Sequence, residues 1–249
     1  MTSNSARDGS QDSDNITSDA EPSGGATGGA TANQRGQSAA LAALWLGFVV
    51  YAFVAAPPNS LDTVDTIRQL STGQWDDLNS WVVALFNCMG LWPLVYAGLA
   101  LADGRRQPLS AWPFVMGSFA LGAFALLPYL ALRRSRAATA APLGTVGQWL
   151  NRPWLGWGIA ISALILFAYP FIQPGGPHAA GLAWQDFCQQ WQQSRFIHVM
   201  SLDFCLLTLL TPTLFWDDMA DRGLNKAWRA LCLVPLVGPA LYIALRPND

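Results

Sequence analysis

One apolar stretch contains the residues that could carry chemistry. Phe196–Trp216 holds a single acid, Asp203, near its middle and His198 near its start. Its 21 residues are enough to cross a hydrocarbon core about 30 Å thick. Placing a carboxyl group inside that core costs roughly 2.5–3.5 kcal/mol, so Asp203 is expected to face protein or water.

Two interpretations of Asp203 remain open. It could relay protons or cations, or anchor a substrate, because ionisable groups within membranes mark such sites. It could instead hydrogen-bond Asn87 and join two spans, for about 1 kcal/mol. His198 lies five positions earlier, about 140° around a helix, and is interpreted as an interfacial histidine rather than a ligand.

A second acidic group follows at once. Asp217, Asp218 and Asp221 spell DDxxD, a spacing that could hold Mg²⁺ against a diphosphate. That chemistry needs a second acidic cluster, for which only Asp62/Asp65 and Asp76/Asp77 are available. The favoured interpretation is an acidic turn at the membrane interface, with Asp218 paired to Arg222 four residues on. The sequence holds no P-loop, Rossmann glycine run, nucleophile elbow or HExxH motif, so no catalysis, cofactor or metal is predicted.

The amino-acid composition indicates the environment in which these residues lie. Hydrophobic side chains make up 52% of the chain and charged ones 12%, about half the charge of an ordinary soluble domain. No basic stripe suited to nucleic acid is present. The four cysteines lack CxxC spacing. Cys88, Cys205 and Cys232 lie in apolar runs and are expected to behave as small hydrophobes. We predict an all-α transmembrane domain over residues 37–249, preceded by a disordered acidic tail at residues 1–36.

The hydropathy pattern predicts about six spans and two amphipathic helices lying in the interface. The two amphipathic helices are expected at Leu61–Leu70 and Leu182–Gln193. The spans are expected at about Ser38–Ala56, Ser80–Ala102, Trp112–Leu132, Trp154–Ile172, Phe196–Trp216 and Trp228–Leu245. Six spans place both termini on one face, and eight basic residues against six then favour termini outside the cytoplasm.

The chain also resembles itself at an offset of 116 residues. Pro58 aligns with Pro174, Trp75 with Trp191, and Asn87 with Asp203. The two units cover about residues 38–136 and 152–249. With three spans each, the second would be inverted relative to the first, an arrangement common in transporters. Chance matching of apolar runs is the alternative.

Two segments carry a family resemblance. Leu91–Arg133 and Trp228–Pro247, the latter with Pro-Leu-Val-Gly-Pro-Ala-Leu-Tyr, resemble small uncharacterised membrane proteins of cyanobacteria and chloroplasts. The resemblance implies a bacterial plasma membrane or a thylakoid membrane, and it carries over no catalytic residue.

The function expected from the sequence is therefore non-enzymatic. The chain is expected to contact the lipid bilayer and other membrane proteins or itself, as an accessory or assembly partner of a membrane complex, for which a photosynthetic complex is one candidate. The alternative is a small secondary transporter or channel with its site at Asn87 and Asp203.

Overall fold

The computed structural model describes residues 25–58, 62–104, 107, 109–133, 145–150 and 152–247, with the side chains from residue 34 onward except those of residues 102, 145 and 146. Throughout these ranges the regular structure is helical and no strand occurs. Residues 1–24 of the predicted tail lie outside the description, and α1 begins at Gly25, inside the segment that the sequence assigned to the tail.

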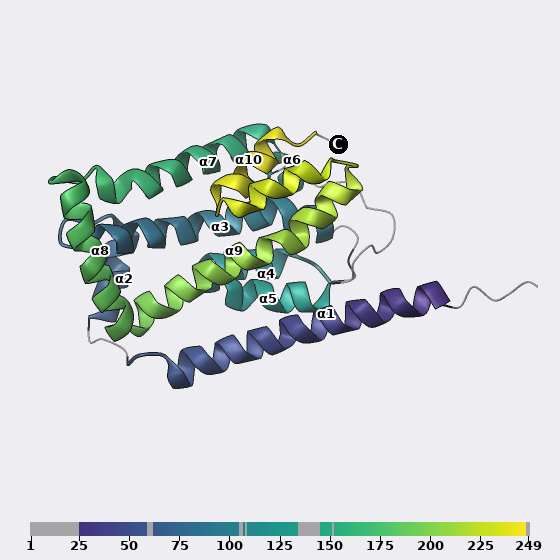
Figure 1. The fold of residues 1–249 in the computed structure, drawn as a ribbon, viewed down its shortest axis with the longest axis horizontal. Coiled ribbons are helices and arrows are strands. Elements are labelled where there is room, and N and C mark those ends of the chain that lie inside the picture. The colour runs from purple at the N-terminus through teal and green to yellow at the C-terminus, as the bar shows by residue number, and fades with distance from the viewer. Residues whose placement is uncertain are drawn as a thin grey trace, which may run out of the picture.

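Four helices of the described chain are long and apolar enough to cross a membrane. They are α1 (Gly25–Val50, continued by the π-helical turn η1, Tyr51–Ala55), α3 (Ser80–Gly104), α7 (Pro153–Ala168, followed by the 3₁₀ turn η2, Tyr169–Phe171) and α9 (Arg195–Asp221). Their 18-residue windows have mean hydropathies of 1.6–2.1. They run lengthwise through the molecule, with α3 and α9 packed together at the centre and α1 along one edge (Figure 1).

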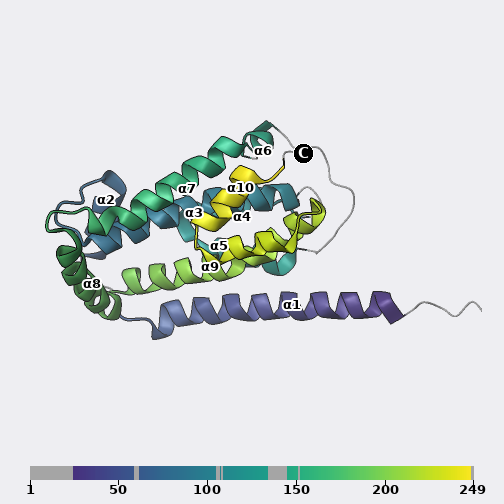
Figure 2. The same cartoon turned by 45° about the horizontal axis from the view of Figure 1, so that its top comes forward.

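Two amphipathic helices lie across one end of these four, which we name the α8 end. They are α2 (Thr63–Thr72) and α8 (Gly176–Gln193), and two views place them at the same end (Figures 1 and 2). The Asn79 side chain joins the start of α3 to α8, donating to the Ala183 carbonyl at 2.7 Å. The prediction of two amphipathic helices in these segments is confirmed.

The predicted third span is wrong, because the chain reverses inside it. α4 (Trp112–Leu121) and α5 (Ala123–Leu132) form a hairpin around Gly122, whose φ of +52° no helix permits. The Phe114 and Tyr129 rings lie 5.8 Å apart, and Gly117 lies against Ala125 nearer the turn, so the two arms are antiparallel. Each arm has 10 residues and is about 15 Å long, half of what a span requires.

The predicted sixth span is a second hairpin. The 3₁₀ helix η3 (Lys226–Leu233) enters and α10 (Val237–Leu245) returns, with Leu236 at φ +61° in the turn. Trp228 lies against Tyr242 and Leu231 against Gly238, which is again an antiparallel pairing. Six spans are therefore corrected to four long helices and two hairpins.

The two halves of the chain run in the same direction. α3 and α9 both start at the α8 end, and their last turns meet at the opposite end, which we name the arginine end because Arg133 and Arg246 lie there. Each half has two long helices, an even number, so the chain returns to its starting side before the second half begins. The inverted arrangement expected from the sequence is thus replaced by a parallel one.

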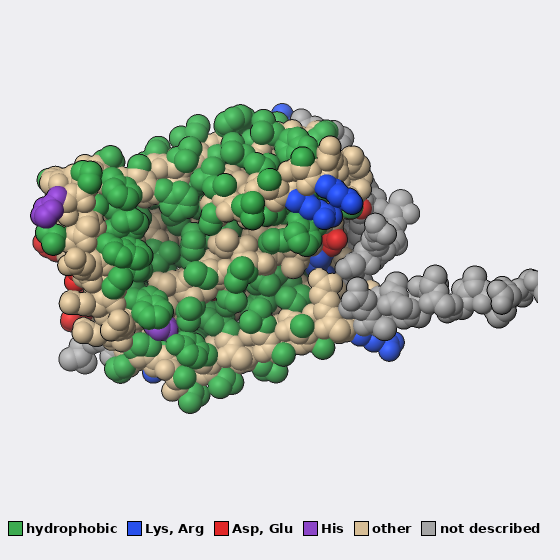
Figure 3. Space-filling view, in the orientation of Figure 1, with side chains coloured by type: hydrophobic (Ala, Val, Ile, Leu, Met, Phe, Trp, Pro, Cys, Tyr) green, Lys and Arg blue, Asp and Glu red, His purple; other side chains and the backbone are tan. Residues whose placement is uncertain are grey.

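Packing and surface fit a bilayer environment. The largest fully buried side chains include Trp92, Tyr96, Phe215 and Tyr242, from α3, α9 and α10. Apolar side chains cover the middle of the visible face, whereas charged ones gather at its two ends (Figure 3). The short helix α6 (Thr145–Leu150) precedes α7 at the arginine end (Figure 1).

Candidate functional site: a carboxylate at the tip of a hairpin

Asp203 meets the tip of the first hairpin. Its Oδ1 accepts a hydrogen bond of 2.7 Å from the backbone N–H of Ala123, the first residue of α5. The first N–H groups of a helix have no hydrogen-bond acceptor within that helix. The Asp203 carboxylate, about 12 Å along α9 from Arg195, accepts from one of those of α5. Asp203 is only 5% exposed, which confirms that it faces protein.

Gly122 makes this approach possible for two reasons. Its backbone angles, φ +52° and ψ −127°, are disfavoured for residues with a side chain. A Cβ at this position would lie 1.7 Å from Oδ2 of Asp203. The carboxyl group therefore occupies the space that any other residue at position 122 would fill.

A cavity of about 530 Å³ lies beside this contact. Its walls come from η1, α2, α3, both arms of the first hairpin and α9. It lies on the side of α9 that faces α1: α7 packs along α3, whereas packing of similar extent between α1 and α9 does not occur in the described chain. The polar residues that line the cavity are Thr63, Ser118, Arg195 and Asp203.

Asn87 and His198 lie elsewhere. Asn87 donates to the Val83 carbonyl of its own helix at 2.8 Å and is not among the hydrogen-bond partners of Asp203 in the described structure, so the expected pair does not form. His198 is buried near the α8 end, with Nε2 2.8 Å from the Tyr51 hydroxyl, Nδ1 2.9 Å from the Trp191 carbonyl and its ring stacked on Trp191.

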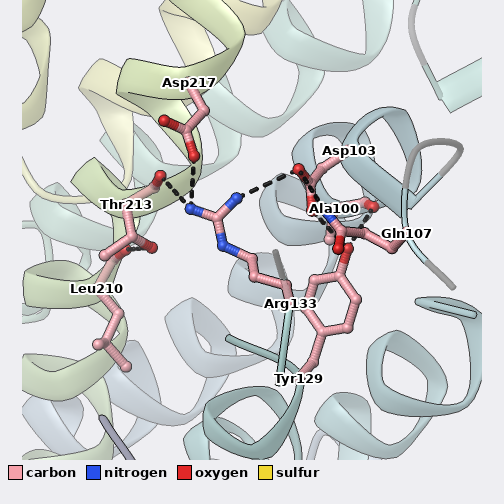
Figure 4. Close-up of polar contacts among 8 residues, drawn as sticks. All are labelled: Ala100, Asp103, Gln107, Tyr129, Arg133, Leu210, Thr213 and Asp217. Atoms are coloured by element: carbon pink, nitrogen blue, oxygen red, sulfur yellow. Dashed lines mark hydrogen bonds and ion pairs between the residues drawn. The ribbon is translucent and has the colours of Figure 1, made fainter. Parts of the chain in front are cut away.

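The acidic turn is bound by arginines. Arg133, at the end of the first hairpin, contacts Asp103 at 3.2 Å and Asp217 at 2.6 Å, and also donates to the Thr213 carbonyl (Figure 4). The Tyr129 hydroxyl donates to Asp103 at 2.7 Å. Arg133 thereby ties the last turns of α3 and α9 together.

The second hairpin repeats this arrangement. Arg246 contacts Asp218 at 2.9 Å and donates to the Gly98 carbonyl of α3 at 3.0 Å. The Tyr242 hydroxyl donates to Asp218 at 2.6 Å, and Arg222 pairs with Asp218 at 3.1 Å as the sequence predicted. Arg133 and Arg246 thus each bind an aspartate of their own half and a backbone carbonyl of the other half.

The sequence contained a signal for these two sets of contacts, made by Arg133 and Arg246, which we name the arginine clasp. Tyr129–Arg133 reads YLALR and Tyr242–Arg246 reads YIALR, 113 residues apart. An ungapped comparison at 116 residues misses the match, because the two hairpins differ in length. The aspartates that receive these contacts, Asp103 and Asp218, are 115 residues apart.

The described side chains include no group of three or more His, Cys, Asp or Glu residues able to hold a metal ion. No protein-family model, curated protein or solved structure matches this chain. The resemblance to cyanobacterial and chloroplast membrane proteins therefore stays a prediction.

Proposed function

We propose that this chain is a non-enzymatic integral membrane protein that serves as an accessory or assembly partner of a larger membrane complex. One observation carries the non-enzymatic part. Asp217 and Asp218, the carboxylates that could have bound a metal–diphosphate, are engaged by Arg133, Arg222 and Arg246. Carboxylates paired with arginine in this way have a structural role and offer little to a cation.

The edge position of α1 supports a role in association. α1 is fixed to the first hairpin by a 3.0 Å hydrogen bond from Trp45 Nε1 to the Phe124 carbonyl and by stacking of Phe48 on Phe124. Only 17% of its span window is buried, so its outer face meets lipid or a partner helix. The large exposed side chains of that helix and of η1 are Leu44, Leu46, Val50, Tyr51, Phe53 and Val54.

Charge supports an orientation opposite to the one favoured by the sequence alone. In the parallel four-span arrangement, two of the nine described Lys and Arg residues, Arg68 and Arg195, lie at the α8 end. The other seven are at the arginine end, where both ends of the described chain also lie. Since basic residues accumulate in the cytoplasm, we propose cytoplasmic termini, in a bacterial plasma membrane or a thylakoid membrane.

Native gel electrophoresis of membranes solubilised in mild detergent tests the partner proposal. The chain is expected to migrate within a band much larger than its own monomer or dimer, and mass spectrometry of that band identifies the other subunits. A lone dimer-sized band under every growth condition would contradict it.

A small transporter or channel is the second candidate, and the hairpin tip inside the membrane favours it. Its site would consist of Asp203 and the hairpin, without Asn87. If transport is the function, Asp203→Asn accumulates normally but fails to restore the phenotype of a deletion strain. If the carboxyl is structural, the amide keeps the bond to Ala123 and restores it.

A further inference from the structure

The cavity beside Asp203 has an aromatic lining. Rings reach it from η1, α3, both arms of the first hairpin and α9, and the Phe86 and Phe196 rings lie 6.4 Å apart. The sulfurs of Met89 and Met200 add polarisable surface that suits aromatic partners. The ring residues are Phe53, Phe86, Phe119, Phe124 and Phe196.

One polar atom within this lining has an unused capacity. Oδ1 of Asp203 is bonded to the Ala123 N–H, but no described residue donates a hydrogen bond to Oδ2. Asp203 is 95% buried, being 5% exposed, and it lines the cavity. A charged donor would have to lose its hydration to enter this apolar cavity, which is costly. An acceptor with unfilled capacity in an apolar cavity calls for a neutral donor.

We infer that this cavity binds a lipid-soluble phenol, whose hydroxyl donates to Oδ2 of Asp203 and whose ring packs among the phenylalanines. A volume of about 530 Å³ lies within the range of small-molecule sites. A phospholipid acyl chain would leave Oδ2 without a donor, whereas a phenol satisfies Oδ2 and offers a flat face to the rings.

The bilayer provides the route of entry. Phe53 is 69% exposed and Phe119 is 50% exposed, although both line the cavity, so they stand at its rim. Arg195 and Thr63 line the cavity towards the α8 end. A ligand dissolved in lipid can therefore pass Phe53 and Phe119 without crossing the polar end. The site does not depend on membership of a larger complex, so it can be tested separately.

Competition labelling of the purified full-length chain tests this inference. A diazirine-bearing 4-octylphenol labels the protein in phosphatidylcholine nanodiscs, and 4-octylphenol or 4-octylanisole competes. The two competitors share ring and chain, but only the phenol donates. We expect the phenol to compete roughly tenfold better than the ether, as the loss of one hydrogen bond to a buried acceptor implies, with label on residues 118–124 and on α9.

Two variants distinguish a hydrogen bond from the phenol to Asp203 from unspecific partitioning of the phenol into lipid. Asp203→Asn retains an acceptor for the Ala123 N–H but turns an amide donor towards the cavity, so the preference for phenol is expected to disappear. Asn87→Ala is the matched control, since Asn87 occupies the corresponding position of the other half and does not line the cavity. It should leave the preference unchanged.

Several results would overturn the inference. They are equal competition by phenol and ether in the unaltered chain, a preference for the ether, labelling confined to other helices, and an unchanged preference in a folded Asp203→Asn. If Asp203→Asn fails to fold, Phe86→Leu replaces it. Loss of that ring should weaken binding of the phenol several-fold, and unchanged phenol binding would count against the site.

Discussion

Gly122→Ala is the substitution whose effect follows most directly from the structure. The new methyl would lie 1.7 Å from Oδ2 of Asp203, so the carboxyl must move away and release the Ala123 N–H. The backbone at φ +52° and ψ −127° adds strain of about 1–3 kcal/mol for a residue with a side chain. Loss of the cap adds about 1 kcal/mol, giving a total of about 2–4 kcal/mol.

A double-mutant cycle separates this loss of stability into the backbone strain at position 122 and the lost hydrogen bond to Asp203. Asp203→Ala alone removes the cap and should cost about 1–2 kcal/mol. In that background the methyl at position 122 meets no carboxyl, so Gly122→Ala should cost only its backbone strain. The double variant is then expected to be about 1 kcal/mol more stable than the sum of the single effects predicts.

The assay is reversible unfolding of the purified protein in mixed micelles as the fraction of denaturing detergent rises. Gly158→Ala is the control, because a Cβ at that helical position meets open space and should change stability by under about 1 kcal/mol. Unfolding of Gly122→Ala within about 0.5 kcal/mol of the unaltered chain would refute the described geometry. Strict additivity in the cycle would show that the glycine and the carboxyl do not meet.

Three further predictions follow from the same structure. Reporter fusions after residues 107, 140 and 224 and at the C-terminus should all report the cytoplasm; opposite sides for 107 and 140 would restore the span predicted from the sequence. Arg246→Met should cost about 3 kcal/mol in the same unfolding assay, because it removes the pairing of a 3% exposed arginine with Asp218, and an unchanged midpoint would show that the clasp is dispensable. Gly156→Val should separate α7 from α10, since a Cβ there meets the Ala240 carbonyl at 2.6 Å; normal accumulation of this variant in membranes would contradict the packing.

Hydropathy and periodicity predicted the elements whose character is local. The long apolar runs at α1, α3, α7 and α9 became helices long enough to span a membrane. The amphipathic patterns of Leu61–Leu70 and Leu182–Gln193 became α2 and α8. Such features depend on side chains a few positions apart, which one sequence displays in full. The burial of Asp203 followed from the cost of placing a carboxyl group in lipid.

The two hairpins could not be predicted from hydropathy and periodicity. Trp112–Leu132 is as apolar as a span, and a single glycine in it is compatible with a continuous helix. The reversal at Gly122 exposes an N–H whose acceptor, the Asp203 carboxylate, comes from another helix. The count of spans, and with it the relative direction of the two halves, therefore becomes visible only in the tertiary structure.

The sequence by itself determined that the chain is helical and apolar, and that Asp203 had to be buried. Only the tertiary structure decided the partners of Asp203, the parallel direction of the halves and the clasp of Arg133 and Arg246. The physical reason is that hydrophobicity acts on each segment separately. A hydrogen bond or ion pair instead needs two groups brought within about 3 Å, and the contacts that join the two halves link residues 80 or more positions apart.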